Sequence, residues 1–62
     1  MIAILRKNAS DEAVSSIVSW IEGKGLTAHV SRGSNETVIG LVGDTTVLDE
    51  KRIRANPYVE NV

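Results

Sequence analysis

The stretch LTAHVSRGSNETVIGLVG, residues 26–43, decides the fold of this chain. Its first part, residues 26–31, alternates between apolar and polar side chains, which is the period-2 pattern of a strand with one buried face. RGSN then supplies turn residues, of which Gly33 and Asn35 are able to adopt a positive φ. Because the apolar run ETVIGLVG, residues 36–43, follows this turn directly, the pattern predicts a β-hairpin.

A strand and a helix are predicted on the amino-terminal side of the hairpin. MIAILR, residues 1–6, is a short, β-rich apolar run typical of a buried strand. Ser10 is a good N-cap, and acidic residues follow it in the first turn. Gly23 and Gly25 are suitable stop residues. A helix over about residues 10–24 is therefore expected, and its apolar stripe is formed by Val14, Ile17, Val18 and Ile21.

A second, shorter helix and a last strand are predicted after the hairpin. Residues 44–46 offer N-caps for a helix over about residues 47–55. Its apolar stripe is weak, because Ile53 does not share a face with the other apolar residues. Pro57 ends this helix, since the residue before a proline disfavours the helical region. YVENV, residues 58–62, reads as a strand.

The predicted order β-α-β-β-α-β is that of the ferredoxin-like fold. Residues 1–62 would form a single α+β domain, with two helices on one face of a four-stranded antiparallel sheet. The first and third predicted strands are apolar at nearly every position, as in strands buried on both faces. We therefore expect the second face to be covered by another copy of the chain, by a neighbouring domain, or by both.

The composition excludes several classes of function. The 62 residues include no cysteine and one histidine, so neither a disulfide nor a zinc site built on cysteines or several histidines can form. The net charge of −1 gives no electrostatic attraction to nucleic-acid phosphates. No apolar run approaches the length of a membrane span. We expect a soluble, cytoplasmic domain without nucleic-acid or membrane partners and without a cofactor of its own.

A row of polar side chains on the first hairpin strand is the candidate site. Thr27, His29 and Ser31 should border the sheet face without helices, where they could orient a small amphipathic ligand. His29 and Ser31 would lie about 6.5–7 Å apart, which is too far for a nucleophile and its base. No catalytic constellation is therefore expected. A solvated or interfacial histidine is the alternative interpretation of His29.

Two glycines frame a pair of apolar residues in VIGLVG and match the GxxG loop of KH domains. That loop needs a preceding helix and a basic residue inside it, and this segment has neither. A close approach of the chain at Gly40 and Gly43 explains both glycines better.

MIAILR, HVSRG and TVIGLVGD together give the chain a family resemblance over essentially its whole length. It resembles the amino-terminal ferredoxin-like domain of type I-beta DAHP synthases (3-deoxy-D-arabino-heptulosonate 7-phosphate synthases). The resemblance implies a longer parent chain whose carboxy-terminal barrel joins phosphoenolpyruvate to erythrose 4-phosphate, using a divalent metal, at the start of the shikimate pathway. The break within a strand after Val62 fits such an excised domain, which would not be an enzyme by itself.

The resemblance also implies a regulatory role. Such domains, similar to ACT domains, bind an aromatic amino acid and mediate allosteric feedback inhibition, with the effector at the interface with a domain of another subunit. His29 and Ser31 look like the family's contacts to the tyrosine hydroxyl. Thr27, Ile39 and Leu41 are further expected contacts to the effector. Tyrosine is favoured and phenylalanine is possible. The alternative is an oligomerisation module that binds no small molecule.

Overall fold

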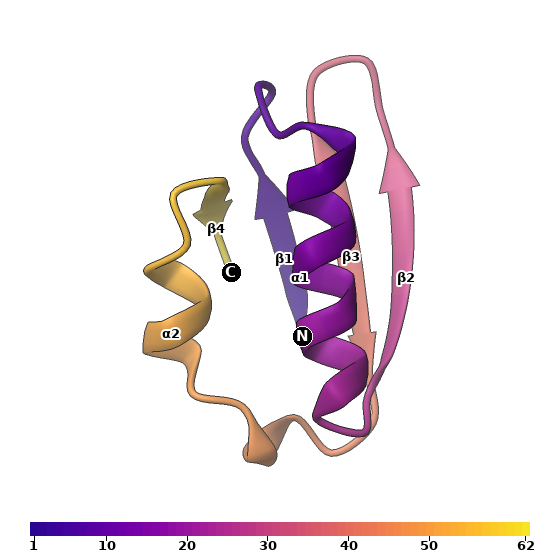
Figure 1. Cartoon of the computed structure of the whole chain (residues 1–62), viewed down its shortest axis with the longest axis vertical. Helices are drawn as coiled ribbons and strands as arrows, with labels where there is room; N and C mark the ends of the chain where they lie inside the picture. The colour runs from indigo at the N-terminus through magenta and orange to yellow at the C-terminus, as the bar shows by residue number, and fades with distance from the viewer.

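The computed structural model describes all 62 residues, which form a four-stranded antiparallel sheet with two helices (Figure 1). The strands lie in the order β2-β3-β1-β4, as in a ferredoxin-like fold. The predicted fold class and order of elements are confirmed. In chain order the elements are β1 (Ile2–Leu5), α1 (Asp11–Gly23), β2 (Thr27–Arg32), β3 (Thr37–Val42), a 3-10 turn (Thr45–Val47), α2 (Glu50–Arg54) and β4 (Val59–Asn61).

Helix α1 begins and ends where the sequence predicts. The Ala13 N–H donates to the Ser10 side-chain oxygen at 3.1 Å, so Ser10 is the N-cap. Gly25 follows the helix with a φ of 84°, a conformation that glycine adopts without strain. An ion pair of 2.7 Å joins Asp11 at the start of α1 to Arg32 at the end of β2. Both side chains are exposed, so the pair adds little stability.

The hairpin of β2 and β3 has the predicted strands, and its turn lies where the sequence predicts, at residues 33–36. Positive φ angles occur at Gly25 and Gly43 and at no other residue, so the turn does not use the positive φ that Gly33 and Asn35 are able to adopt. The Gly33 N–H donates to the Glu36 carbonyl at 2.8 Å. A Cβ on Gly33 would lie 3.0 Å from that oxygen, so a close approach, not a left-handed backbone, favours glycine here.

The second predicted helix is divided in two. Residues 47–55 do not form one helix, because Leu48 has an extended backbone with φ −98° and ψ 141°. Asp44 caps the 3-10 turn and Asp49 caps α2, so each aspartate starts a short segment of its own. Hydrogen bonds from the Thr46 hydroxyl and N–H lower the pKa of the Asp44 carboxyl. Ile53, which the sequence pattern left outside the stripe, is the buried residue of α2.

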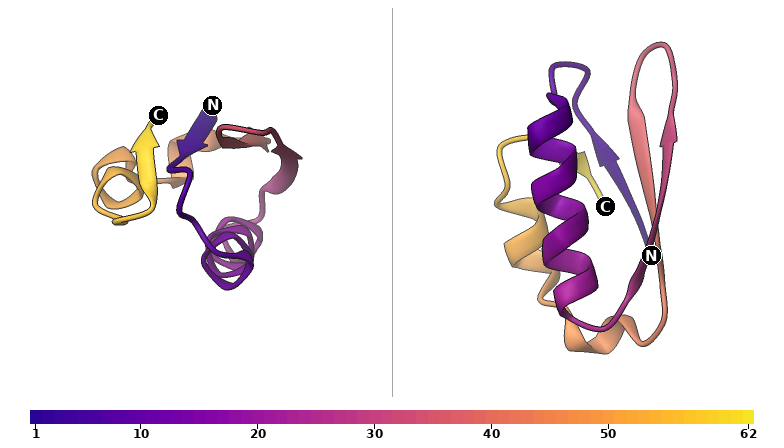
Figure 2. Two further views of the ribbon diagram at one scale, coloured as in Figure 1. Left: turned by 90° about the horizontal axis from the view of Figure 1, so that it is seen from above. Right: turned by 45° about the vertical axis from the view of Figure 1, so that its right-hand side comes forward.

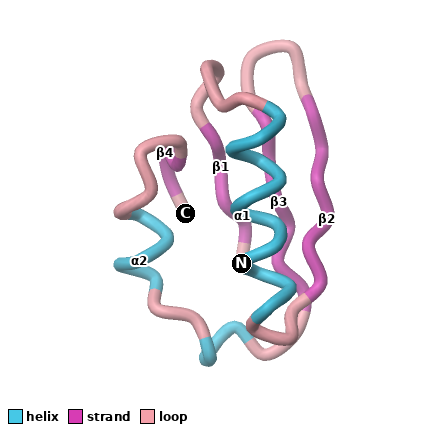
Figure 3. The backbone as a smooth tube through the Cα atoms, in the orientation of Figure 1, coloured by secondary structure: helices cyan, strands magenta, loops and turns pink.

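The core lies on one side of the sheet, beneath both helices. Viewed from above, α1 is seen end-on beneath the sheet, and α2 lies next to β4 at the edge of the sheet (Figure 2). The tube in Figure 3 shows how little of the sheet the short α2 covers. Both helices bury side chains in one cluster, so the expected single covered face is confirmed. The ten core residues are Ala3, Leu5, Val14, Ile17, Ile21, Leu26, Ile39, Leu41, Ile53 and Val59.

No helix in the chain combines the length and apolar character that crossing a membrane requires.

Gly43 ends β3 in a conformation that only glycine tolerates well. Its φ is 128°, and a Cβ there would lie 2.7 Å from Leu26 Cδ2. The close approach predicted for Gly43 is therefore confirmed. For Gly40 the same prediction is wrong, because a Cβ there would meet no atom closer than 3.9 Å.

We expect Gly43→Ala to lower the free energy of unfolding by about 1–3 kcal/mol, because the new methyl group is strained and meets Leu26. Urea unfolding followed by circular dichroism measures this change. Gly23→Ala is the matched control, since a Cβ at Gly23 meets nothing within 4 Å and alanine favours a helix. Equal unfolding midpoints for Gly43→Ala and the parent chain would contradict the close contact.

Candidate functional site

One face of the sheet has no helix over it, and we call it the open face (Figure 2). Its residues follow from strand alternation, because Ala3, Leu5, Ile39 and Leu41 point into the core and their neighbours point away. The pairing of the strands then aligns these neighbours in rows across the sheet. The open face carries Ile2, Ile4, Thr27, His29, Ser31, Val38, Gly40 and Val42.

The polar row of β2 lies on the open face, as its alternation predicts. Thr27, His29 and Ser31 are all exposed, and β2 is an edge strand that pairs with β3 alone. Neither His29 nor Ser31 takes part in a side-chain hydrogen bond within the chain. The hydrogen-bonding groups of both side chains are therefore free for a ligand or a partner.

Two of the expected contact residues do not lie with the polar row. Ile39 is 0% exposed and Leu41 is 4% exposed, and both face the helices. The strand register explains this placement, since Ile39 pairs with Val30 and Leu41 with Ala28. The expectation that they contact a ligand beside His29 is corrected accordingly. The pairing of β2 with β3 in the hairpin is the signal that places Ile39 and Leu41 on the face opposite to His29.

An apolar patch takes the place of these two residues beside the polar row. It consists of Ile2 and Ile4 on β1 together with Val38 and Val42 on β3. Ile2 is 57% exposed and Val42 is 55% exposed, although both belong to strands with an otherwise apolar sequence. Ile4 and Val38 are half-buried, so Ile2 and Val42 are the most exposed members of this patch. The sequence predicted an apolar second face without dividing the residues of β3 between the two faces, and the strand register makes that division.

Each row across the open face joins a polar residue of β2 to apolar residues of β3 or β1. Thr27 lies opposite Val42, and Ser31 lies opposite Val38. His29 lies opposite Gly40, whose other neighbour is Ile2. This arrangement can hold a molecule that has an apolar, flat part and a hydroxyl or other polar group at one end.

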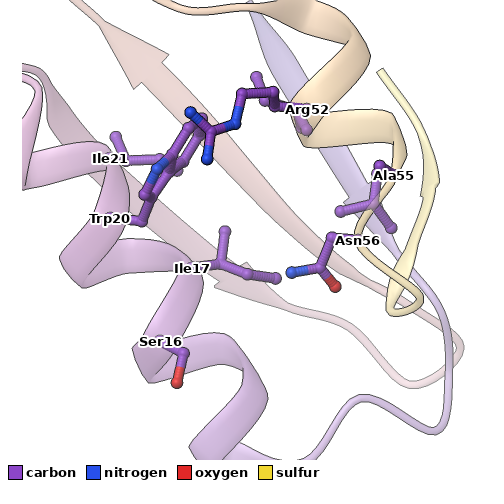
Figure 4. Close-up of a pocket in the computed structure, with 9 residues that line it drawn as sticks. Ser16, Ile17, Trp20, Ile21, Arg52, Ala55 and Asn56 are labelled. Carbon is purple, nitrogen blue, oxygen red and sulfur yellow. The ribbon is translucent and has the colours of Figure 1, made fainter.

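A cavity of about 390 Å³ lies elsewhere, between α1 and the segment containing α2 and β4 (Figure 4). Trp20 and Ile17 form the α1 wall, and Arg52 extends from α2 towards Trp20. The lining contains no residue of the open face. We attribute this cavity to the division of the second helix, because a five-residue α2 is too short to pack along α1. Its lining includes the polar side chains of Ser16, Arg52 and Asn56, and the Asn56 side-chain oxygen already accepts a hydrogen bond from the Tyr58 N–H.

The chain has no group of three or more histidine, cysteine, aspartate or glutamate side chains that could hold a metal ion.

Comparison with known proteins gives a consistent result over the whole chain. Residues 1–62 match the family model described as the DAHP synthase ferredoxin-like domain. A phospho-2-dehydro-3-deoxyheptonate aldolase of Thermotoga maritima is 31% identical over 62 residues, which are 100% of this chain and 18% of that protein. A crystal structure of this DAHP synthase from Thermotoga maritima aligns with a TM-score of 0.89 and 28% identity over 97% of this chain and 18% of its own. The chain thus spans less than a fifth of these relatives.

The placement of the site residues predicts that variants on the open face and variants in the core differ in their effect on the free energy of unfolding. His29→Ala and Ser31→Ala should change the free energy of unfolding by less than about 0.5 kcal/mol, because both side chains are exposed and unbonded. Leu41→Ala should lower it by about 2–5 kcal/mol, because it leaves a cavity in the core. Urea unfolding of the three variants measures the difference. A large loss in His29→Ala would mean that this histidine has a structural role.

Proposed function

We propose that this chain, which belongs to the DAHP synthase ferredoxin-like domain family, is the regulatory domain of a longer, cytoplasmic DAHP synthase and binds an aromatic amino acid. The observation that carries the proposal is the unbonded polar row of β2 beside the exposed apolar patch. The parent enzyme would join phosphoenolpyruvate to erythrose 4-phosphate in a separate barrel. That barrel would also hold the divalent metal, and this chain would catalyse no reaction alone.

Tyrosine is the effector that the open face fits best. His29 and Ser31 project in parallel about 6.5–7 Å apart, so a phenolic oxygen between them lies within hydrogen-bond reach of both. The phenol can donate one hydrogen bond and accept another, and imidazole and hydroxyl groups can supply both partners. The aromatic ring would lie on the apolar patch formed by β1 and β3. Thr27 extends the polar row and is a further possible contact. Phenylalanine would lose the hydroxyl contacts and bind more weakly.

A second copy of the domain would complete the site. A small-molecule site encloses most of its ligand, whereas a sheet face encloses one side only. A partner domain that covers the open face would supply the other wall and bury the exposed side chains of Ile2 and Val42. An effector that binds the paired arrangement more tightly than the separated one shifts the equilibrium by that difference in affinity. Feedback inhibition would follow if the paired domains limit access of substrates to the catalytic barrels.

A ligand-free oligomerisation module is the second candidate function. The exposure of Ile2 and Val42 favours it, because an apolar patch is sufficient for self-association without any small molecule. The two candidates differ in what they require of His29 and Ser31. A regulatory domain uses both side chains for the ligand, and an assembly module needs only the patch.

We expect His29→Ala and Ser31→Ala each to weaken tyrosine binding on the order of tenfold, because each removes one partner of a largely buried hydroxyl. Amide-resolved NMR titration of the chain with tyrosine, at high protein concentration, measures the affinity. Phenylalanine should show little dependence on either variant.

Ser19→Ala is the control for this experiment, since Ser19 is exposed on α1, on the other side of the sheet. It should bind tyrosine as the parent chain does. Unchanged tyrosine affinity in His29→Ala would refute the assigned site. An associated parent chain that shows no shifts with either amino acid would favour the oligomerisation module.

We expect Val42→Glu to weaken self-association at least tenfold, because pairing would bury an unpaired carboxylate. Val47→Glu is the matched control, since Val47 is 52% exposed, almost as much as Val42, but lies in the 3-10 turn outside the open face. Sedimentation velocity over a range of concentrations, with and without tyrosine, gives the dimer population. Equal dimer populations in the two variants would place the interface elsewhere.

A further inference from the structure

Gly40 lies in the middle of β3 without the usual structural reasons for a glycine. Its φ is not positive, in contrast to Gly25 and Gly43. A Cβ at Gly40 would have as its nearest neighbours the Cβ and carbonyl oxygen of His29, both at 3.9 Å, which is ordinary contact. Glycine also weakens a strand relative to a β-branched residue. The fold of the chain therefore does not explain why residue 40 lacks a side chain.

The surroundings of Gly40 indicate what the missing side chain leaves room for. His29 lies directly opposite on β2, and Ile2 lies directly opposite on β1. Val38 and Val42 flank it on β3, two residues away in each direction and on the same face. Gly40 thus leaves a gap in the row of side chains on the open face, between His29 and Ile2. This gap lies at the boundary between the polar row and the apolar patch.

The neighbouring strands set the size of this gap. Adjacent strands are about 4.8 Å apart, so the backbones of β2 and β1 are separated by roughly 10 Å across Gly40. A planar ring can lie on peptide backbone within such a space, between an imidazole on one side and an aliphatic side chain on the other. A side chain at residue 40 would occupy the same space. A strand glycine marks a bulge, a bend, or a site where a ligand or another backbone approaches closely, and the strand register runs through Gly40 without a bulge.

We propose that Gly40 is a specificity-determining residue, whose bare backbone receives the ring of the aromatic effector between His29 and Ile2. This role of Gly40 rests on the proposed function, because it concerns the same ligand on the same face. A methyl group at residue 40 would lift the ring by about 1.5 Å, the length of a carbon–carbon bond. The phenolic oxygen would then lose hydrogen-bonding distance to His29 and Ser31. Gly40 would in this way make recognition of the hydroxyl possible.

The test compares Gly40→Ala, Gly40→Val and the parent chain by NMR titration with tyrosine and with phenylalanine. We expect Gly40→Ala to weaken tyrosine binding on the order of tenfold, and Gly40→Val to weaken it further. The preference for tyrosine over phenylalanine should fall towards one in Gly40→Ala, because the hydroxyl contacts are lost first. Urea unfolding of the same samples should show equal or greater stability, since glycine is less favourable in a strand than alanine and much less favourable than valine.

Gly23→Ala is the matched control, because it adds the same methyl group at the end of α1, away from the open face. It should bind both amino acids as the parent chain does. Parent-like tyrosine affinity in Gly40→Ala would overturn the role of Gly40 and leave the proposed function standing. Equal weakening of tyrosine and phenylalanine would overturn it too, because that result indicates a general disturbance of the face. A parent chain that binds neither amino acid would overturn both proposals.

Discussion

The burial of one face of the sheet, and one face only, is the constraint on which the rest of this structure depends. Strand alternation sends Leu5, Ile39 and Leu41 to the helices and sends Ile4, Val38 and Val42 to the other side. The two helices of the chain form one layer, so the apolar side chains on the other face of the sheet stay outside the core. The open face is therefore a direct consequence of apolar strands in a domain too small to cover them.

The sequence predicts the fold well wherever a strong local pattern and a tertiary contact agree. Ser10 and the stripe through Val14 and Ile21 define α1 almost to the residue, because capping and burial act together there. The prediction of the second helix is wrong in its bounds. Asp44 and Asp49 are both N-caps, and no apolar stripe indicates at which of the two the helix begins. Tertiary packing makes that selection by burying Ile53, and this contact is invisible in the local pattern.

The candidate site was predictable in part for the same reason. Polar residues in strict alternation identify the exposed side of β2, so Thr27, His29 and Ser31 were found from sequence. β3 has apolar residues on both sides, and its alternation carries no polar signal. The face of Ile39 and Leu41 therefore followed only from pairing with β2. The role of Gly40 was not predictable from the sequence either, since a strand glycine can be interpreted only when its neighbours in space are known.

A small domain with one unburied face is well suited to control by a ligand and a second copy. Its core is made of ten side chains, none larger than leucine or isoleucine, so burial in the core alone gives it a modest stability. Only in the paired, liganded form would the apolar patch be buried and the polar row have hydrogen-bond partners. Both changes would stabilise that form. By mass action, the effector then stabilises that form in proportion to its concentration. A domain with a complete core would bind nothing on this face, and the surface that would make the chain regulatory is the surface its own helices leave uncovered.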